Sequence, residues 1–347
     1  MSRAAYRHHG CRITDEITYK GFRTIILEND LLRVGILLDK GADIYSLVYK
    51  PTDTDFLWVS PLGLVDPRQA HPTNSLSSGL FLDTYHGGWQ EIFPGGGPVN
   101  YRGAELGLHG EVAQLGWDYE IVVDSPSEIA VRFSVDCIRT PFMLERTMRL
   151  EMGNPTLFID ETVTNKSPDE QFFMWGHHPA FGEPFLQKGT RIVLPQCKGE
   201  VHSPSFAESS KFSPGSNFVW PLIRDINGKK MDLSICPGIE GGFADLVYLN
   251  DLQDGWYKVV QPDQSLGIEV RWDKSVFPYL WLWMVFGKAP GYPWWDRVHV
   301  IALEPWSSMP NILDKAIERN TQSVLKGGGS RKVSLTARVI SGNEAKI

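Results

Sequence analysis

Two adjacent histidines, His177 and His178, stand in the stretch "FFMWGHHPAF" and suggest acid or base chemistry, because imidazole titrates close to neutral pH. If the stretch is extended, successive side chains point to opposite faces of a strand. His178 then shares a face with Gly176, which leaves space for a ligand, whereas His177 shares the other face with Trp175. We predict that His178 does the chemistry and that His177 is a core or supporting residue.

A carboxylate, Glu304, comes near the end of the apolar stretch "RVHVIALEPW". In a strand it shares a face with Val298, Val300 and Ala302, and a carboxylate in such surroundings is costly to bury unless it is paired or protonated. Perturbed acids of this kind concentrate at functional sites, so Glu304 is a candidate catalytic group. The alternative is that Glu304 lies just past the rim of the core and only pairs with an arginine.

Further histidines and carboxylates lie in two glycine-containing stretches. His109 is flanked by glycines in "GLHGEV", where a strand would place Glu111 on the same face, and "YHGGWQE" contributes His86, Trp89 and Glu91. Groups of this kind raise the question of a metal, but none of the spacings matches a recognised ligand pattern, so no metal is predicted. The sequence also lacks the nucleophile-elbow, phosphate-loop and dinucleotide-binding motifs.

The elements that must position these residues are mostly strands. Segments of alternating apolar and polar residues, bounded by turn residues, predict strands over residues 24–29, 31–39, 42–50, 130–136, 190–196, 267–273, 279–287, 297–306 and 333–341, and two more within 142–165 that meet at "GNP". Only residues 311–325 have a helical pattern. Residues 85–110 are so rich in glycine and proline that we expect a functional loop there. The pattern predicts an all-β protein, a large antiparallel sandwich that forms one domain over residues 1–347.

Composition limits the classes of partner. The chain has 347 residues and a net charge of -7, and its lysines and arginines form no run that could follow a nucleic acid or an anionic membrane. The four cysteines are widely spaced, with no CxxC pair, which favours reduced, structural cysteines. No secretory leader or membrane-spanning run is evident, so a cytoplasmic protein with a small-molecule partner is expected. The twelve tryptophans suit the flat faces of pyranose sugars, although tryptophans also fill β cores.

Taken together, these stretches resemble the aldose 1-epimerase (galactose mutarotase) family. The resemblance is carried by "LENDLLRVGILLDKGADIYSLVYK", "LGLHG", "HPAFG", "LWLWMVFG" and "IALEPWSS", in that order along most of the chain. It implies a galactose mutarotase-like supersandwich that interconverts the α and β anomers of a free sugar or sugar derivative, without an organic cofactor. It also implies that His178 is the general acid, Glu304 the general base and His109 a ligand to the sugar hydroxyls.

The sequence departs from this family in the parts that would contact the sugar. The stretch "YHGGWQEIFPGGG" replaces the segment that usually precedes the Leu-His-Gly motif, and no counterpart is found for the aspartate that often binds distal hydroxyls. Ala180 and Gly182 stand where typical members have tyrosine and asparagine. The substrate therefore stays open. The predicted substrate-binding residues are His109, His86, Trp89, Glu111, His177, Trp175 and Trp306, with Trp295 as a further stacking candidate.

Two alternative functions stay open beside the mutarotase. The chain could be a lyase, isomerase or hydrolase acting on a modified sugar, with a metal held by His86, His109, Glu111 and one of the paired histidines, or a non-catalytic carbohydrate-binding protein. The mutarotase mechanism expects an ordinary pKa for the histidine and a glutamate kept ionised by nearby positive charge. A monomer or a homodimer is expected.

Overall fold

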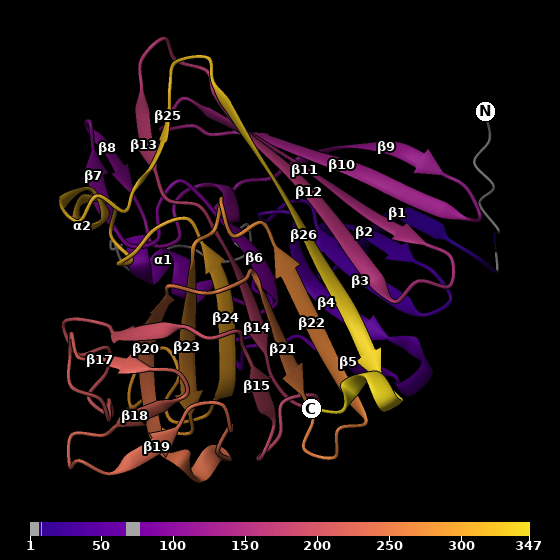
Figure 1. Cartoon of the computed structure of the whole chain (residues 1–347). Coiled ribbons are helices and arrows are strands. Elements are labelled where there is room, and N and C mark those ends of the chain that lie inside the picture. Colours follow the sequence, from indigo (N-terminus) through magenta and orange to yellow (C-terminus); the bar gives the residue numbers. More distant parts are fainter. Residues whose placement is uncertain (1–6, 8, 67–76) are drawn as a thin grey trace.

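Alternating side chains form two large antiparallel sheets in this computed structural model, which describes residue 7 and residues 9–66 and 77–347 (Figure 1). The larger sheet has 14 strands. Along the sheet, its order is β1 (Arg12–Tyr19), β2 (Phe22–Glu28), β3 (Leu32–Leu37), β4 (Asp43–Tyr49), β6 (Trp89–Ile92), β14 (Gly176–Phe181), β24 (His299–Trp306), β23 (Tyr279–Phe286), β20 (Phe243–Asn250), β16 (Lys198–Val201), β17 (Asn217–Val219), β18 (Leu222–Arg224) and β19 (Lys230–Asp232), and β5 (Thr54–Asp55) pairs with β4.

The second sheet has eight strands. Its order is β15 (Arg191–Val193), β21 (Trp256–Val260), β22 (Leu266–Trp272), β26 (Ser330–Ser341), β12 (Thr156–Asn165), β11 (Phe142–Glu151), β10 (Glu128–Asp136) and β9 (Asp118–Asp124). Two short pairs complete the β structure, β7 (Val99–Tyr101) with β8 (Ala104–Leu106) and β13 (Gln171–Phe173) with β25 (Ser323–Leu325). The predicted all-β sandwich is confirmed.

A single large hydrophobic cluster lies between the two sheets and contains side chains from both. Strand β11 shows how the sequence builds it, because its buried positions alternate with half-buried ones from Phe142 to Leu150. All four cysteines are free, as the sequence predicted.

The opposite face of the larger sheet is also covered, around β20, β23 and β24. In β23, Leu280, Leu282 and Met284 point into the cluster between the sheets, whereas Trp281 and Trp283 point into a second cluster on the other face. Burial on both faces explains why "YLWLWMVF" and "HVIALEPW" are almost continuously apolar. This second face carries the candidate site.

Two helices cover part of this second face, α1 (Ser77–Asp83) and α2 (Leu313–Glu318), and Figure 1 shows them on one side of the molecule with the β7–β8 hairpin. Only α2 was predicted, as part of the longer segment 311–325. The expectation of a loop over residues 85–110 is wrong in part, because β6 lies inside it as a central strand of the larger sheet. Pairing of β6 with β14 on one side and β4 on the other overrides the local abundance of glycine.

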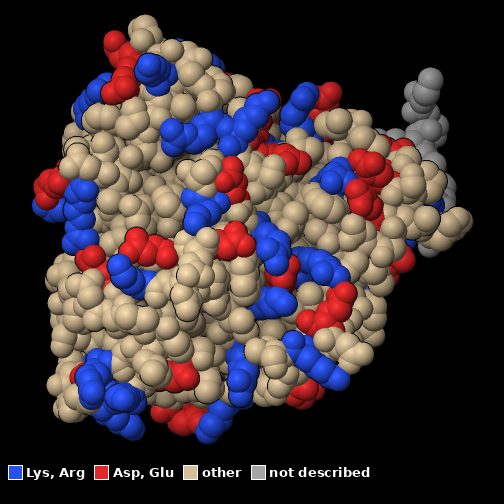
Figure 2. All heavy atoms as spheres, in the orientation of Figure 1, with Lys and Arg blue, Asp and Glu red and all other residues tan. Residues whose placement is uncertain are grey.

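Among the described residues, no helix is long and apolar enough to span a membrane. On the face drawn in Figure 2, lysine and arginine are interspersed with aspartate and glutamate, and neither sign forms a continuous patch.

Candidate active site

Strands β14 and β24 bring His178 and Glu304 together. These strands pair in a register that places Gly176 opposite Trp306 and Ala180 opposite Ala302, so that His178 and Glu304 fall between those two pairs on the same face. The Nε2 atom of His178 lies 3.5 Å from Oε1 of Glu304. The two groups predicted as acid and base are therefore adjacent.

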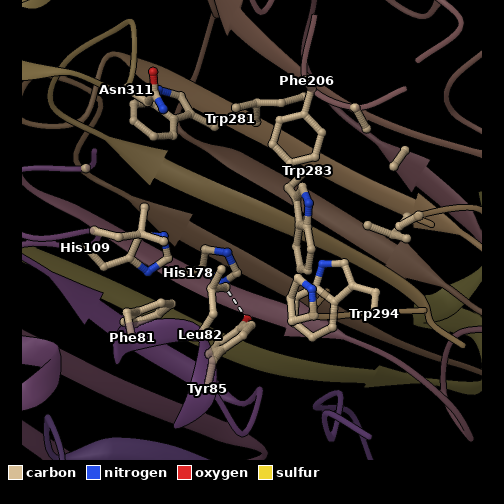
Figure 3. Close-up of a pocket in the computed structure, with 18 of the residues that line it drawn as sticks. Phe81, Leu82, Tyr85, His109, His178, Phe206, Trp281, Trp283, Trp294 and Asn311 are labelled. Atoms are coloured by element: carbon tan, nitrogen blue, oxygen red, sulfur yellow. Dashed lines mark hydrogen bonds between the residues drawn. The ribbon is translucent and has the colours of Figure 1, made fainter. Parts of the chain in front are cut away.

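Each member of the pair has a second polar neighbour. The hydroxyl of Tyr85 lies 3.3 Å from Nδ1 of His178, and the indole Nε1 of Trp306 donates to Oε2 of Glu304 at 3.0 Å. Tyr85 precedes β6 and contacts His178 edge to face, as Figure 3 shows. In each side chain, the polar atom that does not face the other member of the pair contacts one of these neighbours. These contacts fix the orientation of both side chains.

Burial makes the uncharged form of each group the favoured one. His178 is 5% exposed and Glu304 3% exposed. Burial lowers the pKa of His178 to about 4 and raises the pKa of Glu304 well above its usual range, although the hydrogen bond from Trp306 partly opposes the rise. When both groups are in this favoured form, the pair carries one proton and no net charge.

This finding corrects the two electrostatic expectations. The pKa of His178 is not ordinary, and no positive charge among the described residues contributes to the pKa shift of Glu304. Because the groups interact, their titration belongs to the pair, which can still give one proton and accept another.

His109 lies beside this pair. Its backbone has a φ of 63°, in the left-handed region that non-glycine residues rarely adopt, and its amide donates to the carbonyl of Gly96 at 2.7 Å. The ring centroid lies 5.2 Å from that of His178 and 4.4 Å from that of Phe81. Burial, and then the neighbouring His178, hold the pKa of His109 well below its usual value. A neutral His109 beside the pair can hydrogen-bond a ligand hydroxyl.

His178, Glu304 and His109 open into a cavity of about 450 Å³, a volume typical of small-molecule sites (Figure 3). Most of its wall is apolar. The aromatic residues of the wall are Phe81, Tyr85, Phe206, Trp281, Trp283, Tyr292 and Trp294. At the rim, the hydroxyl of Tyr292 donates to Oδ1 of Asp83 at 2.7 Å, which ties the loop after β23 to α1.

A family model covers most of the chain. The model of the family described as "Domain of unknown function (DUF4432)" matches residues 19–339. The chain belongs to this family. No curated protein matches it.

Solved structures show which fold this member of the family adopts. A Klebsiella pneumoniae protein, provisionally named an aldose 1-epimerase, superposes with a TM-score of 0.75 at 16% identity, over 96% of this chain and 84% of that one. A galactose mutarotase-like protein from Clostridium acetobutylicum gives 0.66 at 15% identity, over 96% and 99%. Another from Lactobacillus casei gives 0.62 at 20% identity, over 91% and 100%. The galactose mutarotase-like fold expected from the sequence is confirmed, in a divergent branch.

The space beside Gly176 was interpreted wrongly. A Cβ atom at this position would lie 2.2 Å from Cδ2 of Trp306, so the missing side chain makes room for an indole rather than for a ligand. Trp306 itself does not line the cavity; it stacks on Trp281 with ring centroids 3.9 Å apart and supports Glu304. His178 does line the cavity, but the absence of a side chain at Gly176 is not what makes room beside it.

Three predicted sugar ligands lie on the other face of the larger sheet, in a network between the sheets. Trp89 donates from Nε1 to Nδ1 of His177 at 3.1 Å, and Nε2 of His177 lies 2.9 Å from Oε2 of Glu161. Trp175 donates to Glu91 at 2.5 Å. Trp89, Trp175 and His177 are fully buried and do not line the cavity, so their placement does not support direct contact with a sugar.

A metal does not fit this network. Glu91, Glu161 and His177 are the one group of potential ligands within 4.8 Å of one another that the described part of the chain contains. Because Nδ1 of His177 accepts from Trp89, the proton of the neutral ring is on Nε2, which then has no lone pair for an ion. Arg146 supplies the neutralising charge instead, with Nη1 3.2 Å from Oε2 of Glu91.

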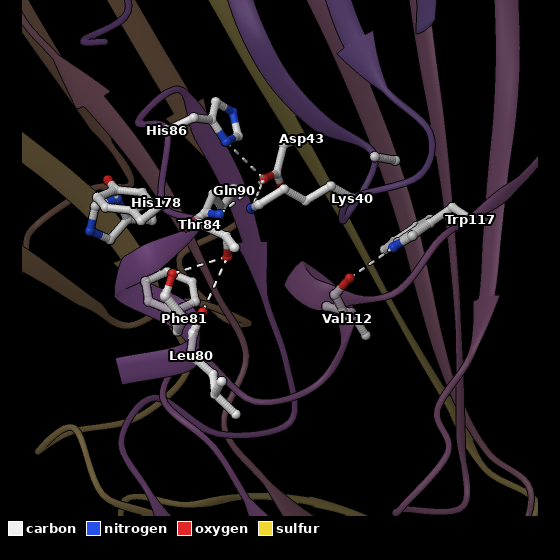
Figure 4. A network of polar contacts seen from close by, with 12 residues as sticks. Lys40, Asp43, Leu80, Phe81, Thr84, His86, Gln90, Val112, Trp117 and His178 are labelled. Carbon is white, nitrogen blue, oxygen red and sulfur yellow. Dashed lines mark hydrogen bonds and ion pairs between the residues drawn. The ribbon is translucent and has the colours of Figure 1, made fainter. Parts of the chain in front are cut away.

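Glu111 and His86 also lie apart from the cavity. The strand expected around His109 is wrong, since the chain turns there and Glu111 caps the backbone amides of Ile138 and Arg139 at 2.8 and 2.7 Å. The buried His86 has Nδ1 4.0 Å from Oδ2 of Asp43, which also accepts from Lys40 and Gln90 (Figure 4). The metal set proposed from His86, His109 and Glu111 is therefore not assembled by the described residues.

Several wall residues were missed by the sequence reasoning. Trp295 was a stacking candidate, but it is 60% exposed, and its neighbour Trp294 lines the cavity instead. Trp281 and Trp283 could have been found, because they are two positions apart and share one face of a predicted strand that could pair with the strand of Glu304. Nothing in the local sequence of Tyr85 signals its contact with His178.

Proposed function

We propose that this protein interconverts the α and β anomers of an aldose or a close derivative, with His178 and Glu304 as its acid–base pair. The observation that carries the proposal is the 3.5 Å approach of the two groups on the floor of an aromatic cavity. The fold shared with galactose mutarotase-like proteins supports it.

The chemistry needs one proton donor and one proton acceptor. Opening of the sugar ring requires a proton on the ring oxygen and removal of the proton from the hydroxyl on C1. A pair that holds one proton supplies both functions and returns to its starting state when the ring closes. Rotation about the C1–C2 bond of the open aldehyde before closure gives the other anomer.

The proton also determines how the sugar lies. The group that begins with the proton must face the ring oxygen, and the other group must face the C1 hydroxyl. The resemblance assigns the proton to His178, whereas burial in the unliganded site favours Glu304. Both arrangements use the same two groups, so loss of either group stops the cycle.

Anomer exchange measured by NMR saturation transfer tests the proposal. The purified protein is mixed with equilibrated hexoses, pentoses and their derivatives, and transfer between the two anomeric protons is compared with the uncatalysed rate. Glu304→Gln and His178→Asn should each lower the enzymatic rate by about 10² to 10⁴. Glu304→Gln keeps an oxygen that can accept from Trp306, so its unfolding midpoint should stay close to that of the parent. Near-parental exchange in both variants would remove the assignment.

A further inference from the structure

Rows of side chains that cross the strands of the larger sheet lie beneath the cavity, and part of each row forms its floor. The row through the pair contains Gln90, His178, Glu304, Trp281 and Tyr248, from β6 to β20. Every member of this row has a polar atom. It is the row over which ring opening would take place.

The next two rows are apolar from strand to strand. Ala180, Ala302, Trp283 and Leu246 form the second row, and Val300, Val285 and Ala244 form the third. Two residues along a strand advance by about 7 Å, so the second row begins within one sugar ring of the pair. The indole of Trp283 is the one group in these rows that could donate a hydrogen bond.

The cavity extends over these apolar rows. Leu246, Trp283, Val285 and Ala244 line it, whereas Trp306 and Gly176, on the other side of the polar row, do not. Figure 3 shows Trp283 beside Trp294 and Phe206, and the Trp283 ring centroid also lies 5.6 Å from that of His178, so the apolar rows begin directly next to the pair. A sugar with C1 over the pair therefore has its far carbons over an apolar floor.

The remaining polar side chains of the described wall do not change this arrangement. Asn311 lies near Trp281, at the end of the polar row (Figure 3). Tyr292 and Glu208 are exposed at the rim, and the Tyr292 hydroxyl already donates to Asp83. In the described structure, neither of these two side chains contacts the part of the floor that would lie beneath the far carbons of the sugar.

From this floor we infer that the substrate is an aldose whose end distant from C1 is apolar, such as a deoxy sugar or a sugar with an alkyl or acyl group at that end. The inference rests on the proposed function and specifies its substrate class. A distal hydroxyl buried over the second and third rows loses its hydrogen bonds with water and finds no replacement. A methyl group at the same place gains from contact with Trp283, Leu246 and Val285.

Matched sugars test this inference. Saturation transfer is measured with 6-deoxyglucose against glucose, 6-deoxygalactose against galactose, and 6-O-butanoylglucose against glucose. The 6-deoxy sugar should have a kcat/KM about 10- to 100-fold above that of its hydroxylated parent. A preference confined to the butanoyl sugar would assign a longer apolar group, and a preference for the 6-deoxy sugars alone would assign the methyl group; both outcomes support the inference.

Two other outcomes overturn it and are distinguishable. Exchange of the parent hexoses at an equal or higher kcat/KM would refute the apolar substrate class while the mutarotase function stands. No exchange with any sugar would refute the proposed function, and the inference with it.

A pair of isosteric variants adds a test within the protein. Val285→Thr places a hydroxyl on the floor and should reduce the preference for the deoxy sugar by about 2- to 10-fold. Val300→Thr is the matched control, because Val300 is the neighbour of Val285 in the same row but does not line the cavity. An unchanged preference in Val285→Thr, with the fold intact by near-ultraviolet circular dichroism, would count against the inference.

Discussion

The hydrogen bond from Trp306 to Glu304 offers a sensitive test of the pair, because it acts on the ionised carboxylate. Trp306→Phe removes the 3.0 Å bond and retains an aromatic ring over Trp281. A hydrogen bond to a charged group contributes about 1.5 to 3 kcal/mol, and one pKa unit corresponds to about 1.4 kcal/mol. Loss of the bond should therefore raise the pKa of Glu304, and the corresponding limb of the pH–activity profile should move by about 1 to 2 pH units.

The direction of this shift follows from the form that the bond stabilises. Trp306 donates to the carboxylate and lowers its pKa, so the variant holds the shared proton up to a higher pH. The alkaline limb of kcat/KM, where the pair loses its proton, should move upward by the same 1 to 2 units. Saturation transfer over a pH series, after subtraction of the uncatalysed rate, measures this limb.

A neighbouring tryptophan gives the matched control. Trp281 belongs to the same stack, but its indole donates to the carbonyl of Ser308 at 3.1 Å and not to the pair. Trp281→Phe should therefore leave the alkaline limb in place, although it changes the wall of the cavity. If the alkaline limb of kcat/KM in Trp306→Phe stays at the parental pH or moves to lower pH, Glu304 is not the group that titrates there.

Three further outcomes are expected. The acid limb of kcat/KM should fall near pH 4, because the lowered pKa of His178 keeps the ring neutral until then; a limb near pH 6.5 would contradict the burial argument. Gly176→Ala should lower the free energy of unfolding by about 1 to 3 kcal/mol in urea titration, since the new Cβ meets the Trp306 ring, whereas Gly95→Ala, with its nearest contact at 3.8 Å, should have little effect. Arg146→Met should destabilise the protein by about 3 to 5 kcal/mol in the same assay, because it leaves buried carboxylates without a cation; a change below 1 kcal/mol would show that the network carries no charge.

The side of the strand on which each candidate lies could be predicted from the sequence. The period of two is a local property, so it separated His178 from His177 and grouped Glu304 with Val300 and Ala302. The structure agrees with both assignments, because His178 and Glu304 line the cavity, His177 lies in the network with Glu161, and Val300 and Ala302 belong to the cluster on the cavity face. Local periodicity was sufficient because these strands have no bulge between the residues that matter.

Contacts that depend on the pairing register between distant strands could not be predicted from the sequence. The space beside Gly176 is filled by Trp306, which lies 130 positions further along the chain. Strand β6 exists because β4 and β14 pair with it, although its own surroundings in sequence are rich in turn residues. Helix α1 and Tyr85 approach His178 through tertiary packing alone, so no local sequence pattern indicates their place beside it.

The pKa values were missed for the same reason, and they connect catalysis with specificity. One polar row crosses the floor beside two apolar rows, and burial in these surroundings desolvates His178 and Glu304, so that both favour their uncharged forms. The same apolar side chains offer little to the far hydroxyls of a sugar. A floor with more polar groups would bind such hydroxyls better but would also favour the ionised carboxylate, and the pair would then lose its shared proton at a lower pH. The environment that tunes the pair is therefore also the environment that selects the substrate.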